Sequence, residues 1–256
     1  MKNTSTVALK FCLAVLLQNS AYGQGTPETQ KWETAGFKNV EISDIDLAPF
    51  YQGTAQVPAV KGLALKSVVL RGSGWTLSEI KERTQDMTDT LGQCGVKLTS
   101  YKVITVDALP GLQRFDGMVR TGAEFLDDPH KKEAKVANML PDSARPVMFY
   151  VQAIAMYSAY ANLAEATQEG YKTAPVVDTI WIAKSITYTE NKYNPYYSVE
   201  AHELGHVLGK LQHLYLPKLP GPMTNLMAAD MYKLSPTLNA GQCEKILKSG
   251  LLAPLK

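Results

Sequence analysis

Apolar runs with two different spacings mark the regular elements of this chain. Residues 63–70 form an apolar run, and residues 96–106 alternate and are rich in β-branched side chains, so each segment predicts a strand. Between them, residues 77–91 place apolar side chains at helical spacing, with Thr76 or Ser78 as the N-cap. A strand, a helix and a strand in this order predict two parallel strands joined by a crossover.

The second half of the chain continues with apolar runs at residues 146–154 and 179–183, which predict two more strands. An alanine-rich stretch between them, residues 159–166, predicts either a short helix or a surface excursion. Residues 197–208 predict a helix, and Gly209 follows as a residue that can end it in a left-handed conformation.

The N-terminus has the pattern of a secretory signal. Lys2 and Lys10 precede a short apolar core, and Ala21-Tyr22-Gly23 fits the small-x-small rule for signal peptidase. We interpret residues 1–23 as a signal peptide cleaved near Gly23, which predicts a secreted or periplasmic protein. The alternative interpretation is a buried N-terminal helix.

Composition and charge narrow the class of protein further. The 256 residues are 45% hydrophobic and 20% charged, as in ordinary globular proteins. Without Lys2 and Lys10, basic and acidic residues are equal in number, so no basic surface predicts a nucleic-acid partner. The apolar runs are shorter than the roughly 20 residues of a membrane-spanning helix, which predicts no membrane anchor. Residues 24–59 lack a sustained period and predict an extended segment ahead of a main domain, residues 60–256.

The cysteine count predicts one disulfide. Cys12 lies in the predicted signal peptide, which leaves Cys94 and Cys243 in the exported chain. An even pair in an exported protein favours a disulfide between them. The alternative is two free, buried thiols.

The predicted helix at 197–208 carries the residues with the clearest chemistry. His202 and His206 are four positions apart, so a helix places both imidazoles on one face, where they can bind one zinc ion. Glu203 points slightly round the helix, close enough to reach a water on the metal without binding the metal itself. Zinc acidifies that water, and Glu203 can take its proton and return it to the leaving amine.

A catalytic zinc takes three protein ligands and keeps one position open. Beyond His206, the sequence offers His213, Asp230, Glu244 and Cys243 as further donors. We favour His213 as the third ligand, because a turn at Gly209 would bring the chain back beneath the helix. A loop role for His213, or Glu244 as the ligand, is the alternative.

Two motifs resemble those of the metzincins, a family of zinc peptidases. HELGHVLGKLQH, from His202 to His213, resembles the signature H-E-x-x-H-x-x-G-x-x-H. Thr224-Asn225-Leu226-Met227 resembles the Met-turn of the family, and residues 235–246 resemble the helix that follows it. The resemblance implies an α+β fold with a twisted, mostly parallel sheet, an active-site helix below it, and a small C-terminal subdomain with a Met-turn and a helix.

The resemblance also implies roles for single residues, with one departure. His202 and His206 would bind zinc, Glu203 would be the general base, and Met227 would form a hydrophobic floor. The family spacing places the third histidine at position 212, where this chain has Gln212. Either one inserted residue after Gly209 absorbs the shift to His213, or Gln212 faces the metal and the site is altered.

These features predict a secreted zinc endopeptidase that acts on polypeptides, in which residues 60–256 form the catalytic domain of a monomer. Two alternatives stay open: a hydrolase of peptidoglycan peptides, and an inactive zinc-binding protein on the same fold. Intact Glu203 argues against the second alternative, because a purely structural site has no need of a base.

Overall fold

The computed structural model describes residues 26–52, 57–107, 114–115, 136–137, 139–141, 145–154, 159–162, 178–186, 198–214, 225–228 and 237–255. The predicted signal peptide lies outside the described residues. No helix in the described part of the chain is long and apolar enough to cross a bilayer.

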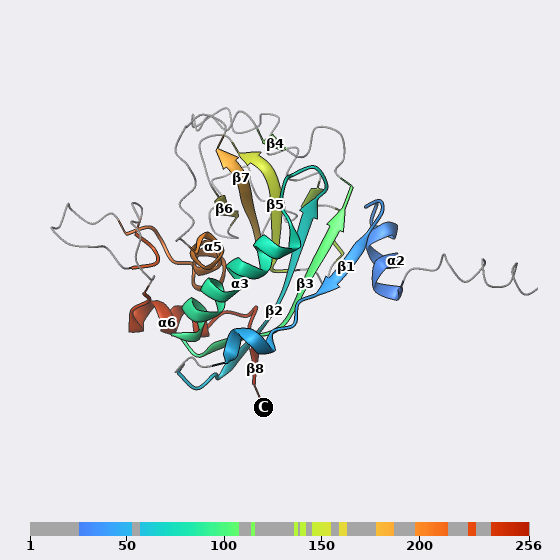
Figure 1. Cartoon of the computed structure of the whole chain (residues 1–256). Coiled ribbons are helices and arrows are strands. Elements are labelled where there is room, and N and C mark those ends of the chain that lie inside the picture. Colours follow the sequence, from blue (N-terminus) through green and yellow to red (C-terminus); the bar gives the residue numbers. More distant parts are fainter. Residues whose placement is uncertain are drawn as a thin grey trace, which may run out of the picture.

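Within these residues, eight strands form one sheet that is mostly parallel (Figure 1). The strands are β1 (Glu41–Asp44), β2 (Lys61–Leu70), β3 (Val96–Val106), β4 (Arg114–Phe115), β5 (Val147–Ile154), β6 (Ala159–Asn162), β7 (Thr179–Ile186) and β8 (Ala253–Pro254). Six of them follow the order β1-β3-β2-β5-β7-β6, while β4 pairs with β5 and β8 with β2. The central strands β3, β2, β5 and β7 are parallel, and the outer strands β1 and β6 run antiparallel to their neighbours.

Four α-helices occur among the described residues, together with a 3-10 turn, η1 (Ala48–Tyr51). The helices are α2 (Pro27–Thr34), α3 (Leu77–Gly92), α5 (Val199–Gly209) and α6 (Ala240–Leu247). The mostly parallel sheet of the prediction is therefore confirmed, within a mixed α/β architecture.

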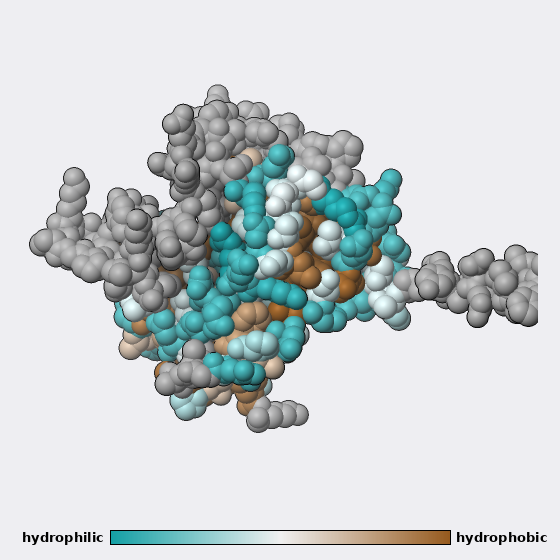
Figure 2. All heavy atoms as spheres, in the orientation of Figure 1, coloured by the Kyte–Doolittle hydropathy of each residue, from teal (hydrophilic) through white to brown (hydrophobic). Residues whose placement is uncertain are grey.

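The first crossover is confirmed, since α3 connects β2 to its parallel neighbour β3. Thr76 is the N-cap: its hydroxyl accepts a hydrogen bond from the Glu79 N–H, and the Glu79 carboxylate accepts one from the Thr76 N–H. This capping box satisfies two of the free N–H groups at the start of the helix. The face of α3 that points away from the core carries exposed polar side chains, and Figure 2 shows a hydrophilic surface over this helix.

Both faces of the sheet are covered at β5, and this strand is apolar along most of its length. In β5, Met148 and Tyr150 pack in a core with α3, α5 and α6, while Phe149 and Val151 pack on the other face with Trp32 of α2. Parallel strands buried on both faces have this continuous apolar pattern. The first of these cores contains Val199, Ala201 and Leu204 and so fixes the helix α5 against the sheet.

The segment 24–59 is not simply extended in its described part. It contains α2, η1 and β1, and β1 adds an antiparallel strand beside β3. Thr26 caps α2, and Pro27 occupies its first turn, where the missing N–H of proline costs no hydrogen bond. Trp32 from α2 then anchors the segment in the core.

The prediction for the alanine-rich stretch is wrong in its first half. Residues Ala159–Asn162 form β6, which pairs antiparallel with β7 at the end of the sheet. Their sequence, AYAN, has weak strand propensity, so the pairing with β7 determines the conformation. The rest of the stretch lies outside the described residues.

Candidate metal centre

A capping serine and a buried apolar face position the helix α5. Ser198 is the N-cap, and its hydroxyl accepts a hydrogen bond from the Ala201 N–H at 3.3 Å. Ala201 and Leu204 pack into the core beneath the sheet. His202 and His206, one turn apart, have ring centroids 4.9 Å apart on one face of the helix.

The helix ends one residue later than predicted. Gly209 stays in the helix, and Lys210 takes the left-handed conformation with φ of 49° and ψ of 35°. Gly209 is needed for its small size instead: a Cβ there would lie 2.9 Å from Ile246 Cγ1 and 2.9 Å from Leu211 Cγ. The predicted left-handed turn at Gly209 is therefore wrong by one position, although the chain does reverse there.

After this turn the chain brings His213 to the other two histidines. The Nε2 atom of His202 lies 3.0 Å from that of His213 and 3.2 Å from that of His206, and the third distance is also 3.2 Å. Among the described residues, these three histidines form a group that can hold a metal ion. Gln212, the alternative metal-facing residue, is exposed and lies outside this group.

The other candidate donors do not join the group where the structure describes them. Glu244 is exposed on α6 and forms an ion pair with Lys248 at 2.6 Å. Cys243 is bonded to Cys94. Asp230 lies outside the described residues.

Two backbone carbonyls fix the tautomers of the helical histidines. Nδ1 of His202 lies 2.7 Å from the carbonyl oxygen of Leu226, and Nδ1 of His206 lies 2.5 Å from that of Leu211. A carbonyl oxygen only accepts, so each Nδ1 carries the hydrogen and each neutral ring leaves its Nε2 bare. Burial lowers the pKa of His202 to about 4 and also lowers the pKa of His206, which keeps both rings neutral.

This arrangement fits a metal ion. Two bare nitrogens 3.2 Å apart have no hydrogen to share, so their lone pairs repel until a cation lies between them. Three nitrogens on one tetrahedral zinc, at about 2.0–2.1 Å each, would be about 3.3–3.4 Å apart. The Nε2–Nε2 distances of 3.0–3.2 Å in this structure are close to that geometry. Imidazole donors suit zinc and also copper, iron and nickel.

Glu203 lies beside the first histidine in a buried position. Its side chain is 6% exposed, and burial, together with the charge of Glu200, raises its pKa to about 8. Within the described residues, no hydrogen bond to the Glu203 carboxyl group occurs. A carboxyl group with a pKa near neutrality can both take and release a proton, as a general base requires.

A second buried acid, Glu200, lies in the first turn of α5. Glu200 is paired with Arg83 of α3 at 3.3 Å and lies 3.5 Å from the hydroxyl of Tyr150. Burial raises the pKa of Glu200, and Arg83 opposes that shift. The sequence analysis missed this pair, because its two residues are 117 positions apart in the chain.

Met227 packs directly against α5 at Gly205. It is fully buried, and a Cβ added at Gly205 would lie 2.9 Å from its sulfur. The close approach explains a glycine between the two helical histidines. Met227 is thus a core residue in contact with α5, and its role as a hydrophobic floor stays a prediction.

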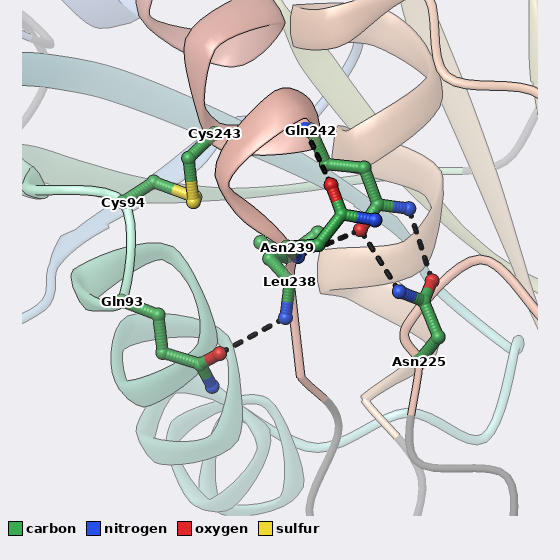
Figure 3. Close-up of a disulfide and its surroundings, with 7 residues drawn as sticks. All are labelled: Gln93, Cys94, Asn225, Leu238, Asn239, Gln242 and Cys243. Carbon is green, nitrogen blue, oxygen red and sulfur yellow. Dashed lines mark hydrogen bonds between the residues drawn. A yellow bond between two sulfur atoms is a disulfide. The ribbon is translucent and has the colours of Figure 1, made fainter.

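The segment around Met227 is held by the C-terminal helix. The side-chain amides of Asn225 and Gln242 form two reciprocal hydrogen bonds, of 2.9 and 3.0 Å (Figure 3). Next to Gln242, the predicted disulfide is present: Cys243 is bonded to Cys94 at the end of α3, with Cα atoms 4.8 Å apart. The sequence analysis missed the amide pair, although Asn239 and Gln242 have the spacing of a capping box.

No protein-family model matches this chain, and no curated protein matches it either.

Proposed function

We propose that the protein is an exported zinc-dependent peptidase that hydrolyses peptide bonds in polypeptides. One observation carries the proposal: three imidazole nitrogens converge within 3.2 Å of one another, and a buried acid, Glu203, lies on the same helix. The resemblance to the metzincin motifs, now with His213 in the group, supports the same function.

The ligand set favours a catalytic zinc over a structural one. Structural zinc sites are usually closed by four protein ligands, whereas catalytic sites keep three and leave one position open. Among the described residues, only these three histidines form such a group. His213 is exposed and His206 is half-buried, so solvent can reach the group.

The residues of the chain would divide the work. When bound, zinc would polarise the peptide carbonyl, acidify the attacking water and favour the ionised form of Glu203. Glu203 would accept the proton of the water and donate it to the leaving amine nitrogen. The carbonyls of Leu226 and Leu211 would hold the rings of His202 and His206 in their ligand tautomers.

The end of the sheet supports a polypeptide substrate. β6 is the last strand of the sheet path and contacts α5, which carries the histidines. Within the described residues, no strand pairs with its outer edge. An extended peptide can add to such an edge through backbone hydrogen bonds. The disulfide and the N-terminal signal pattern support export, because disulfides persist in oxidising compartments.

A Glu203→Gln variant tests the proposal. We expect it to bind one zinc ion per chain as the natural protein does, and to lose about 10²–10⁴-fold in the rate of hydrolysis of an unfolded protein substrate. Glu244→Gln, which changes an exposed acid on α6, is the matched control and should keep full activity. An undiminished rate of hydrolysis by Glu203→Gln would contradict the proposal. The absence of hydrolysis by the zinc-loaded natural protein would also contradict it.

A further inference from the structure

We propose that Gln242 is a positioning residue for the metal centre, acting through Asn225 on His202 and His213 but not on His206. The inference rests on the proposed function only in that the three histidines bind a metal ion.

The first link joins His202 to the turn that contains Asn225. His202 Nδ1 donates to the Leu226 carbonyl at 2.7 Å, so the position of this peptide group sets the direction of the ring. A partner of this kind fixes both the tautomer and the orientation of a metal-binding histidine.

The second link joins the same turn to His213. The N–H of Leu214, the residue after His213, donates to the Met227 carbonyl at 2.7 Å, and Leu214 forms a parallel bridge with Ala228. Movement of the turn would therefore displace the chain on which His213 lies. His206 differs, because its Nδ1 donates to Leu211, in the loop that directly follows α5.

Asn225 shapes the turn with its side chain. Its Oδ1 accepts from the Met227 N–H at 2.9 Å, and its backbone carbonyl accepts from the Ala228 N–H at 3.1 Å. An asparagine side chain that bonds the backbone two residues ahead stabilises such a turn. The Met227 N–H and the Leu226 carbonyl belong to the same peptide group. The orientation of the Asn225 side-chain amide therefore determines where this carbonyl points.

Gln242 fixes that amide. Its Oε1 accepts from Asn225 Nδ2 at 2.9 Å, and its Nε2 donates to Asn225 Oδ1 at 3.0 Å. The same Oε1 accepts from the Asn239 N–H, which ties the pair to the start of α6 (Figure 3). Gln242 is 8% exposed, so water competes little for these bonds.

The helix that carries Gln242 is itself anchored. Cys243 is bonded to Cys94, and the Gln93 side chain accepts from the Leu238 N–H at 3.0 Å. Gln93 therefore offers a matched control, because its loss loosens the same helix end without touching the amide pair.

The test measures metal binding by the full-length protein, with a chelator that competes for zinc and with the visible absorption of the cobalt-loaded protein. We expect Gln242→Met, which removes both bonds to Asn225, to bind zinc about 10-fold more weakly and to change the cobalt spectrum. Gln93→Met should match the natural protein in both measurements. Asn225→Ala combined with Gln242→Met should bind no more weakly than Asn225→Ala alone, because Gln242 acts through Asn225.

Gln242→Glu gives a second test if Gln242→Met does not fold. A glutamate keeps the acceptor for Asn225 and for the helix cap but loses the donor to Asn225 Oδ1, so we expect an intermediate loss of affinity. Unchanged binding by either folded variant, or an equal loss in Gln93→Met, would overturn the inference. A natural protein that binds no zinc would instead refute the proposed function.

Discussion

The chemistry of His202 and His206 depends on two backbone carbonyls. Because Leu226 and Leu211 accept from the Nδ1 atoms, the bare Nε2 atoms face one another and His213. Burial opposes protonation of both rings. The site is therefore a set of neutral imidazole donors that could hold a cation. The neighbouring acid Glu203 has a raised pKa, so its carboxyl group keeps its proton near neutral pH.

Glu203 should make the metal-free protein less stable as pH rises. The folded state holds its proton up to a pKa of about 8, whereas the unfolded chain releases it near the ordinary value of 4.5. Folding in that interval therefore requires proton uptake, and the stability of the natural protein falls between pH 4.5 and 8.

Thermal unfolding in the presence of a chelator checks this linkage. Glu203→Gln lacks the titrating group, so its Tm should rise relative to that of the natural protein by several degrees between pH 5 and pH 8. Glu244→Gln, with an exposed side chain, should show no such rise. A Tm difference that stays constant over this range would show that Glu203 has an ordinary pKa.

At the scale of elements, close packing around α5 needs glycine at two points. Gly205 leaves room for the Met227 sulfur, and Gly209 leaves room for Ile246 of α6 and for Leu211. The middle of α5 therefore packs closely against the turn at Met227, and its end packs closely against α6.

Replacing Gly209 with alanine should therefore destabilise the protein, despite the better helix propensity of alanine. Overpacking costs about 1–3 kcal/mol, and the gain in propensity offsets up to about 1 kcal/mol of it. Gly250→Ala is the control, because a Cβ at Gly250 meets no atom within 4 Å. Denaturant unfolding measures both variants, and a Gly209→Ala variant as stable as the control would disprove the close contact.

The elements differ in how far sequence alone predicts them. β3 was predicted to the residue, because Val96–Val106 alternates and is rich in β-branched side chains. β6 was not, since AYAN becomes a strand only through its pairing with β7. In the site, local spacing identified His202, Glu203 and His206. The Asn225–Gln242 pair was missed because a contact across 17 residues leaves no periodic signal.

At the scale of the whole molecule, one disulfide joins the crossover helix to the C-terminal helix. Cys94 and Cys243 are 149 residues apart, and the loop between them contains the motif helix and the turn at Met227. The bond therefore restricts the unfolded chain over most of the domain and holds α6 beside the site.

Loss of this disulfide should lower the free energy of unfolding by about 2–5 kcal/mol. A Cys94→Ser/Cys243→Ser variant, followed by denaturant unfolding, measures the loss, and the reduced natural protein should unfold like the variant. Equal stability of the variant and the oxidised natural protein would contradict the expectation.

Zinc-edge diffraction from the zinc-loaded protein would show whether His202, His206 and His213 hold one catalytic zinc ion. We expect a single anomalous peak about 2.0–2.1 Å from their Nε2 atoms, with no fourth protein ligand. A peak elsewhere, or a fourth side chain that closes the site, would contradict it.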